Sequence, residues 1–540
     1  MRPECLPFSQ IPHTTRLFSD FISHYPKVQK FYPRSPHFAE WMKNAPVDYD
    51  RPRREQVAAI LEGQNRSWDA SPRTMENIAR LRSGASALVT GQQVGLLGGP
   101  LFSLFKALTA VKLADLAARS GRECVPVFWL ATEDHDLAEV NQVSIPGPDA
   151  VLQPFTAPTD AIADAPVAAV KFGAEFQSVV DQAVGLLGAS EISDFIRQAY
   201  RPGESFGVAF AQLFARLIAD WGVILLDASD PELHRVAEPV YRAAIEHATQ
   251  LDDALLARGK ELEDAGYHQQ VKVTPSSTLL FTLRNGARVP VHHRSNGPTA
   301  NKEAEFLIAE EKISRSELLS RIAAAPQNVS PNVLLRPVVQ DYLLPTLAYT
   351  GGSAEVAYFA QVAVVYEQIL GRITPIIPRF SATIVEPKPK GLLERYGLSL
   401  PDLFHGPELL REQLAAHTLP KELQSAFDEA QASVEKSLAS IRDGLARLDK
   451  TLVDSADHAA SKMRHQLESL RARAARAELR QSEILGRHAE LLSNALYPNK
   501  ALQEREVAGV YFLARYGPRF LHDLYENLNA ECLDHQVISM

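Results

Sequence analysis

VTGQQVGLLGGP (residues 89–100) and VFWLATEDHD (residues 127–136) decide the fold of this chain. Each stretch begins as a short apolar strand and ends in a loop, which is rich in glycine in the first and acidic in the second. The two lie about one strand-plus-helix unit apart, as consecutive parallel strands of a βαβ unit do. Because ligands collect at the carboxyl ends of the strands in open α/β sheets, both loops are expected to open on one crevice. This arrangement favours an enzyme over a scaffold.

The neighbouring sequence extends the α/β pattern. Residues 86–89 predict the first core strand, and residues 125–130 form a continuous apolar run that is typical of a strand buried on both faces. Between them, apolar residues at helical spacing predict a helix from Pro100 to Gly121. Residues 221–227 predict another buried strand of the same core.

Helices and inserted segments are expected around this core. Helices are predicted over residues 51–63, over residues 206–218 and from Pro231 to about residue 259. Residues 144–175, which are rich in Pro, Ala, Asp and Val, indicate an insertion with short strands.

A second insertion is indicated by a hairpin signal. Strand-like pieces over residues 270–273 and 278–283 are followed by Asn285-Gly286, a pair that favours a tight turn between two antiparallel strands.

The character of the chain changes after residue 421. Apolar residues follow a heptad seam, and no proline interrupts residues 421–496. The seam consists of Val434, Leu438, Ile441, Leu445, Leu448 and Leu452. One very long helix and an antiparallel hairpin that turns near residues 454–457 both fit the spacing, and we prefer the hairpin. The segment is either the cap of a helical bundle or a dimer arm.

Composition excludes several classes of protein. A chain of 540 residues is too long for one core, and 46% hydrophobic with 22% charged residues is ordinary for a folded protein. The net charge of -9 argues against nonspecific nucleic-acid binding. Cys5, Cys124 and Cys532 lie far apart, so neither a cysteine-rich zinc site nor a disulfide framework is expected. Without an apolar signal core or spanning segment, the sequence predicts a cytoplasmic protein that does not bind membranes.

The glycine-rich loop is a candidate anion site. Glycines let the backbone approach a ligand closely, and the N-terminus of the following helix suits a phosphate or a carboxylate. The loop matches neither the P-loop nor the GxGxxG pattern, so a tight structural turn is the alternative. Lys106, two turns into the helix, either neutralises an anion or lies on the surface.

The acidic loop, Glu133-Asp134-His135-Asp136, is a more specific signal. Three carboxylates beside one imidazole repel each other unless a cation lies among them. Such a group could bind a substrate ammonium, deprotonate an attacking amine or hold Mg²⁺. An acid-rich helix cap is the structural alternative.

Several sequence blocks together resemble the bacillithiol biosynthesis cysteine-adding enzymes. The resemblance runs nearly from end to end. Its blocks are TGQQ (90–93) with Gly99, Pro100 and Lys106, PVFW (126–129) with EDHD (133–136), RPVVQDYLLP (336–345) with residues 349–360, LQER (502–505) and HQVI (535–538).

This resemblance implies a fold, a reaction and an assembly. The fold would be α/β, with a Rossmann-like parallel-sheet core related to class I aminoacyl-tRNA synthetases, two connecting-peptide insertions and a C-terminal α-helical coiled coil. The reaction would be a ligation that adds L-cysteine to glucosaminyl-malate and gives bacillithiol. Apart from the resemblance, ATP is the expected driver because amide formation from a free acid is uphill in water. Mg²⁺ is a candidate cofactor because the acidic loop offers carboxylate oxygens, and zinc is not expected because the cysteines form no cluster. The coiled coil would make a homodimer.

The same plan divides the chain into eight segments. They are an N-terminal helical segment packed on the core (1–80), the first core part (81–143), the first insertion (144–200), the second core part (201–265), the second insertion (266–330), the third core part (331–395), the coiled-coil arm (396–495) and a C-terminal segment that returns to the core (496–540).

The resemblance also assigns the site residues. The acidic loop, Glu133, Asp134, His135 and Asp136, would be catalytic, with His135 or a neighbouring carboxylate as the base. Substrate or nucleotide would be bound by Thr90, Gly91, Gln92, Gln93, Gly99, Pro100, Lys106, Arg336, Gln340, Tyr342, Tyr349, Gly351, Gly352 and Glu355. The alternatives are a nucleotidyl or glycosyl transferase that uses the same crevice, and a non-catalytic coiled-coil scaffold.

Overall fold

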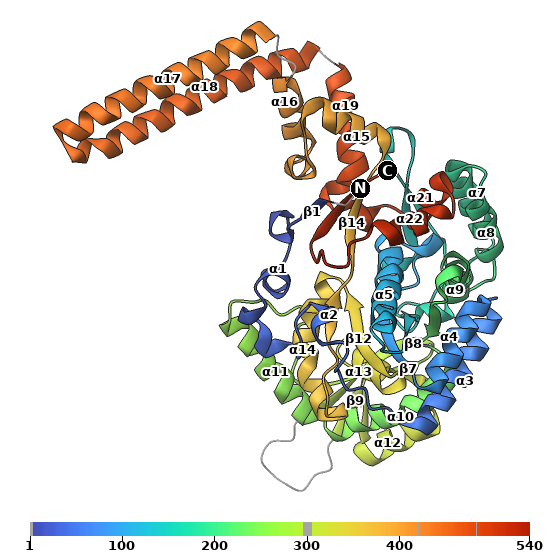
Figure 1. Ribbon diagram of the computed structural model, residues 1–540. Coiled ribbons are helices and arrows are strands. Elements are labelled where there is room, and N and C mark those ends of the chain that lie inside the picture. Colours follow the sequence, from blue (N-terminus) through green and yellow to red (C-terminus); the bar gives the residue numbers. More distant parts are fainter. Residues whose placement is uncertain (1–3, 295–304, 418–420, 482) are drawn as a thin grey trace. The chain divides into compact units, whose positions relative to one another are not determined.

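The computed structural model describes residues 4–294, 305–417, 421–481 and 483–540 (Figure 1). It divides into two compact units. The first comprises Met1–Ile145, Leu152–Thr383 and Glu504–Ile538, and the second comprises Pro146–Val151, Ile384–Gln503 and Ser539–Met540. Residues 295–304 of the expected second insertion, and 418–420 and 482 of the expected arm, lie outside the described residues.

A five-stranded parallel sheet forms the core of the first unit, in the order β13-β12-β2-β3-β6. Its strands are β2 (Ser86–Gln92), β3 (Cys124–Leu130), β6 (Ile224–Asp227), β12 (Thr346–Gly351) and β13 (Ile376–Pro378). Helix α5 (Phe102–Arg119) connects β2 to the adjacent parallel β3, which confirms the predicted βαβ unit. Every residue of β3 is buried, as the continuous apolar run predicts.

The helices of this unit bury their apolar faces around the sheet. They include α3 (Arg51–Ser67), α4 (Pro72–Ser83), α9 (Phe206–Leu217), α10 (Pro231–Glu246), α11 (Ala248–Asp264), α13 (Arg336–Leu343) and α14 (Ser353–Leu370). The single helix predicted from Pro231 to about residue 259 is wrong, because the backbone leaves helical geometry at His247 and starts again at Ala248.

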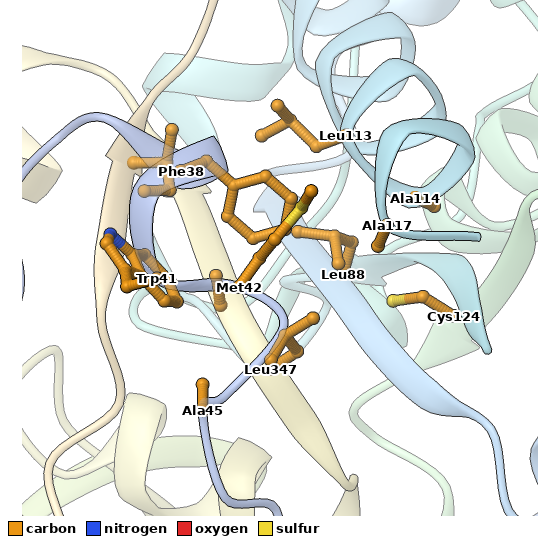
Figure 2. Packing of buried hydrophobic residues seen from close by; sticks show 12 residues of the cluster. Phe38, Trp41, Met42, Ala45, Leu88, Leu113, Ala114, Ala117, Cys124 and Leu347 are labelled. Carbon is orange, nitrogen blue, oxygen red and sulfur yellow. The ribbon is translucent and has the colours of Figure 1, made fainter. Parts of the chain in front are cut away.

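The N-terminal segment packs on one face of the core. Phe38 and Trp41 of helix α2 (Phe38–Trp41), with Met42, contact Leu88 of β2 and Leu347 of β12 (Figure 2). Leu113, Ala114 and Ala117 of α5 complete the same cluster. These contacts fix α5 and β2, and with them the start of the glycine-rich loop.

The two segments that the sequence predicts as insertions contain short strands. Strands β4 (Gln142–Pro146) and β5 (Leu152–Thr156) pair with each other. The second of these segments forms a five-stranded sheet in the order β10-β9-β8-β7-β11. Its strands are β7 (Ser277–Arg284), β8 (Ala287–Arg294), β9 (Glu305–Ile308), β10 (Glu311–Ser314) and β11 (Val329–Pro331).

The predicted hairpin is confirmed, but one predicted strand is not. Asn285 and Gly286 both have positive φ angles, 52° and 84°, as a two-residue hairpin turn of this kind requires. Residues 270–273 form no strand. The side-chain amide of Gln361 satisfies the backbone N–H and carbonyl of Val271 instead of a neighbouring strand.

The two ends of the chain meet in a small sheet. Strand β1 (Glu4–Leu6) pairs antiparallel with β15 (His535–Ser539), and β14 (Ser381–Val385) follows β15 in the sheet order. Cys5 and Cys532 form a disulfide beside this pairing, and Cys124 is buried and free. This single bond is not a disulfide framework, but the sequence did not predict it. The two cysteines are 527 residues apart in sequence and come together only because β1 pairs with β15.

Replacing Cys532 by serine is expected to lower the stability of the oxidised protein by about 2–4 kcal/mol, because the disulfide restricts the unfolded chain. The check is thermal unfolding of wild type and variant, each with and without a thiol reductant. The difference should vanish in the reductant. An equal difference in both buffers would show that the disulfide does not contribute.

The second unit contains the coiled coil. Its helices are α15 (Pro387–Tyr396), α16 (Pro407–His417), α17 (Lys421–Leu448), α18 (Val453–Gln481) and α19 (Glu483–Leu496). Helices α17 and α18 lie side by side (Figure 1), and ion pairs join Arg442 to Asp457 and Arg471 to Asp428. The end of α17 thus pairs with the start of α18, and the start of α17 pairs with the end of α18. The two helices therefore run antiparallel, which confirms the preferred hairpin.

The hairpin turns earlier than predicted. The reversal lies at residues 449–452, not at 454–457, because the Asp449 carboxylate accepts hydrogen bonds from the N–H and hydroxyl of Thr451, both at 2.8 Å. None of the described helices is long and apolar enough to span a membrane.

Candidate active site

A cavity of about 650 Å³ opens in the first unit where β2, β3 and β12 end. Both loops that follow the first two strands contribute to it, as parallel neighbours should. Eleven of the predicted site residues line it: Gly91, Gln92, Gln93, Lys106, Glu133, Asp134, His135, Arg336, Tyr349, Gly352 and Glu355.

Three predicted residues of the glycine-rich loop lie away from the cavity lining. The Thr90 hydroxyl donates to the Thr350 carbonyl at 2.9 Å and so joins β2 to β12. Gly99 has a φ of 73°, a conformation that glycine adopts without strain, and Pro100 bridges to Ala508. This part of the loop is therefore the structural turn that was the alternative interpretation.

Four further predicted residues also lie outside the lining. Asp136 caps the short helix α6 (Leu137–Val140) by accepting the N–H of Glu139. Gln340 is fully buried in α13, and Tyr342 lies beneath the guanidinium of Arg53, 3.8 Å from the ring centroid. Gly351 belongs to β12. The alternative interpretation of the acidic loop as a helix cap is therefore correct for Asp136, whereas Glu133, Asp134 and His135 line the cavity.

A buried ion pair lies at one side of the cavity. The Lys106 ammonium is 2.8 Å from Oε2 of Glu355 and donates to the Gly91 carbonyl and the Gln92 side chain. Burial lowers the pKa of Lys106, and Glu355 opposes that effect. Burial alone would raise the pKa of Glu355, but Lys106 holds it below its usual range. The 2.8 Å contact between the two side chains is that of a buried ion pair.

Arg336, Arg379 and Arg505 also line the cavity, and together with Lys106 they form what we call its cationic wall. Arg379 follows β13 directly and lies 2.8 Å from the buried Glu504. Arg505 also lines the cavity, and burial followed by the nearby Arg379 lowers its pKa. Among the described residues, no ion pair to Arg336 or Arg505 is found. The wall therefore suits an anionic ligand such as a carboxylate or a phosphate.

Sequence reasoning missed Arg379, Arg505 and a third arginine, Arg288 of β8. Arg379 carried one usable signal, because it stands just after a strand of the parallel sheet. Arg505 lies in the LQER block. Arg288 carried none, because its position depends on how the sheet that contains β8 packs.

Glu133 is the most perturbed carboxyl group of the site. Its side chain is only 11% exposed. Burial raises the pKa of Glu133 to about 8, with Arg288 acting in the opposite direction and Asp227 in the same direction. A carboxyl group with this pKa exchanges a proton near physiological pH, as a general base or acid requires.

His135 is held differently. The Arg288 guanidinium lies 2.9 Å from Nδ1 of His135, and a guanidinium can only donate. Nδ1 therefore accepts, and the neutral ring carries its proton on Nε2, so the ring has no free lone pair. Asp134 accepts a hydrogen bond from Gln93 at 2.7 Å. Glu133 is thus the residue of the acidic loop that is best placed to accept a proton.

The described residues also bear on metal binding. Residues 4–294, 305–417, 421–481 and 483–540 contain no cluster of three or more His, Cys, Asp or Glu side chains that could hold a metal ion.

Comparisons with known proteins match the whole chain. The family model described as Bacillithiol biosynthesis BshC, N-terminal Rossmann-like domain, matches residues 1–380, and the C-terminal coiled-coil domain model of BshC matches residues 382–540. Three similar proteins each carry the name "Putative cysteine ligase BshC". The protein of Koribacter versatilis is 48% identical over 100% of both chains, and that of Solibacter usitatus is 37% identical over 100% of both. That of Salinibacter ruber is 33% identical over 97% of this chain and 96% of its own.

Proposed function

The chain belongs to the bacillithiol biosynthesis BshC family, and from this premise we propose that it is a ligase that adds L-cysteine to glucosaminyl-malate. The new amide bond would join the cysteine carboxylate to the glucosamine nitrogen and give bacillithiol. The name of the relatives supports the ligase class and cysteine as a substrate. The observation that carries the proposal is the cavity itself. Glu133, which would accept a proton, and the cationic wall line the same cavity.

Energy must enter the reaction, because amide formation from a free acid is uphill in water. We propose that ATP activates the cysteine carboxylate as an acyl-adenylate or acyl-phosphate, with Mg²⁺ held by the phosphates of the nucleotide. The cationic wall around Lys106, Arg336 and Arg379 would hold phosphates or the two malate carboxylates.

Glu133 would act at the second step. An ammonium has no lone pair, so the glucosamine nitrogen must lose a proton before or during its attack on the activated carbonyl. The Glu133 carboxylate takes that proton, the C–N bond forms and the activating group leaves with the electron pair of the broken C–O bond. Asp134 and the ring of His135, fixed by Arg288, would orient the amine.

The direct test is incubation of the purified protein with cysteine, glucosaminyl-malate and ATP, analysed by mass spectrometry. An amide-linked thiol is expected, and release of AMP or ADP distinguishes the two forms of activation. If no such thiol forms and glucosaminyl-malate does not bind, the proposal is wrong. Turnover of a sugar nucleotide would instead favour the transferase alternative.

Arg379→Met is expected to raise the KM of the anionic substrate about 10- to 100-fold, because a hydrogen bond to a charged group is lost. Arg242→Met is a suitable control, since Arg242 pairs with Glu238 outside the cavity lining. Steady-state kinetics with each substrate varied in turn is the measurement, and it also identifies the substrate that the wall binds. An unchanged KM for every substrate would contradict an anion-binding role.

We also propose a cytoplasmic homodimer that forms through the coiled coil. Apolar side chains stay exposed along the hairpin of a single chain, among them Ile441, Leu448 and Leu470, which are 54%, 79% and 55% exposed. A second copy would cover them. The molar mass from light scattering tests this proposal, with Leu448→Glu expected to shift the protein towards monomer.

A further inference from the structure

Two buried polar side chains lie behind Glu133 and take no part in the cavity lining. His234 and Tyr241 are seven residues apart on one face of α10 and are 4% and 2% exposed. Nε2 of His234 is 3.3 Å from Oε1 of Glu133, and the Tyr241 hydroxyl is 3.0 Å from Nδ1 of the same ring. Glu133, His234 and Tyr241 thus form a row that starts at the cavity and ends in the core.

The contacts within this row determine which ring nitrogen of His234 carries the proton. Burial lowers the pKa of His234 to about 4, against the opposing effects of Asp230 and the Val329 carbonyl, so the ring is neutral and carries one N–H. Burial raises the pKa of Tyr241 well above its usual range, so the hydroxyl keeps its proton. That proton has no other acceptor among the described residues. The hydroxyl therefore donates to Nδ1, and the ring N–H lies on Nε2, where the Val329 carbonyl and the Glu133 carboxylate are its two acceptors.

We infer that His234 is a positioning residue, which is held by Tyr241 and directs its Nε2–H at the Glu133 carboxylate in order to keep this group ionised and aimed at the substrate amine. The inference rests on the proposed function of Glu133. In the described part of the chain, Oε1 of Glu133 is buried and accepts no well-aligned hydrogen bond. Catalytic hydrogen bonds are often loose in the free enzyme and tighten when substrate binds.

A purely structural role explains this row poorly. Three buried polar groups with an imperfect hydrogen bond stabilise a core less than apolar side chains of the same size do. The row also connects directly to the one carboxyl of the acidic loop that is placed to accept a proton. A role in holding that carboxyl accounts for both facts.

Other charged groups also act on Glu133. Arg288 of β8 and Arg336 of α13 favour its ionised form, whereas Asp227 of β6 and the adjacent Asp134 oppose it. None of these belongs to α10. Variants of His234 and Tyr241 leave them in place, so a change in the titration of Glu133 in such variants reports on the row itself.

The experiment titrates Glu133 without any substrate. The infrared carboxyl band of wild type minus Glu133→Gln is followed against pH, and the same difference is measured in the His234→Gln and Tyr241→Phe backgrounds. In Tyr241→Phe nothing fixes the ring proton on Nε2, so Nε2 can instead accept a hydrogen bond from the protonated Glu133 carboxyl, which favours the protonated form. We expect the titration to move up by about one pH unit in both backgrounds, as loss of a hydrogen bond to a charged group predicts.

Tyr267→Phe is the matched control, because Tyr267 is a buried tyrosine that donates to Asp20 instead. Its titration should match wild type. The acid limb of kcat/KM for amide formation should move with the infrared titration in Tyr241→Phe and stay in place in Tyr267→Phe. If His234→Gln does not fold, Tyr241→Phe decides alone.

The outcomes separate the two proposals. An unchanged Glu133 titration in folded Tyr241→Phe overturns the inference, whether or not the protein makes the amide. A shifted titration in a protein that makes no amide supports the positioning role and overturns the proposed function.

Discussion

Replacing Glu133 by glutamine is expected to lower the turnover of amide formation by about two to four orders of magnitude, the usual contribution of a general base. Glutamine keeps the shape of the side chain and a hydrogen-bonding carbonyl, but it cannot accept the proton of the amine. Wild-type kcat/KM should rise as the pH rises through about 8, because the base is active only when ionised and its pKa is raised to about 8. The variant should lack this limb.

Asp136→Asn is the matched control, since Asp136 belongs to the same loop but caps α6 away from the cavity lining. Its turnover should stay close to that of wild type. Turnover is measured by mass spectrometry of the thiol product over a pH series. A Glu133→Gln enzyme with wild-type turnover and an unaltered acid limb would exclude Glu133 as the base.

The same substitution should have the opposite effect on stability. The pKa of Glu133 is higher in the folded protein than its ordinary value of 4.5, so the folded state binds more protons than the unfolded state between these two values. Wild-type stability therefore falls as pH rises through this window, and the loss is complete above pH 8. Glu133→Gln should therefore melt at a higher temperature than wild type at pH 8. Such a gain is expected where a residue that is needed for catalysis destabilises the folded protein.

Local sequence patterns were sufficient for the parts of the fold that depend on local physics. The apolar runs that precede Thr90 and Ala131 predicted neighbouring parallel strands, and the pair Asn285-Gly286 predicted a hairpin turn. The heptad seam predicted long helices over α17 and α18 but fitted one long helix as well as the preferred hairpin, and the turn predicted at residues 454–457 was wrong. The observed turn depends on one side chain, Asp449, which bonds the backbone of the residues after it.

Tertiary contacts decided the parts that the sequence did not reveal. The disulfide between Cys5 and Cys532 depends on the pairing of β1 with β15. In the candidate site, the sequence predicted the part of the cavity lining that comes from the loops after β2 and β3, because the ends of strands are recognisable in sequence. Arg288 comes from β8, and no sequence spacing predicts how the sheet that contains β8 packs. His234 lies within an ordinary amphipathic helix and has no sequence signal of its own.

Lys106→Met is expected to cost about 3–5 kcal/mol of stability, the usual result of removing one partner of a buried ion pair. Nζ of Lys106 is 2.8 Å from Glu355, and the side chains are only 5% and 16% exposed. Without the ammonium, the Glu355 carboxylate keeps the N–H of Gly352 and the hydroxyl of Tyr349 as donors but has lost its counter-ion. Urea unfolding measures the loss. Lys260→Met is the control, because the exposed Lys260–Asp264 pair should contribute less than about 1 kcal/mol.

The pH dependence of this loss identifies its cause. In wild type, Lys106 holds the pKa of Glu355 below its usual range, so the stabilisation is present above that range and is lost as pH falls through the folded pKa. In Lys106→Met, burial acts unopposed by the ammonium and raises the pKa of Glu355, so the stability of the variant falls as pH rises. The difference between the two proteins should therefore grow from pH 5 to pH 8. The double variant Lys106→Met/Glu355→Gln should lose less than the sum of the single variants. An additive double variant would mean that Lys106 stabilises the protein through its backbone contact with Gly91 and not through the carboxylate.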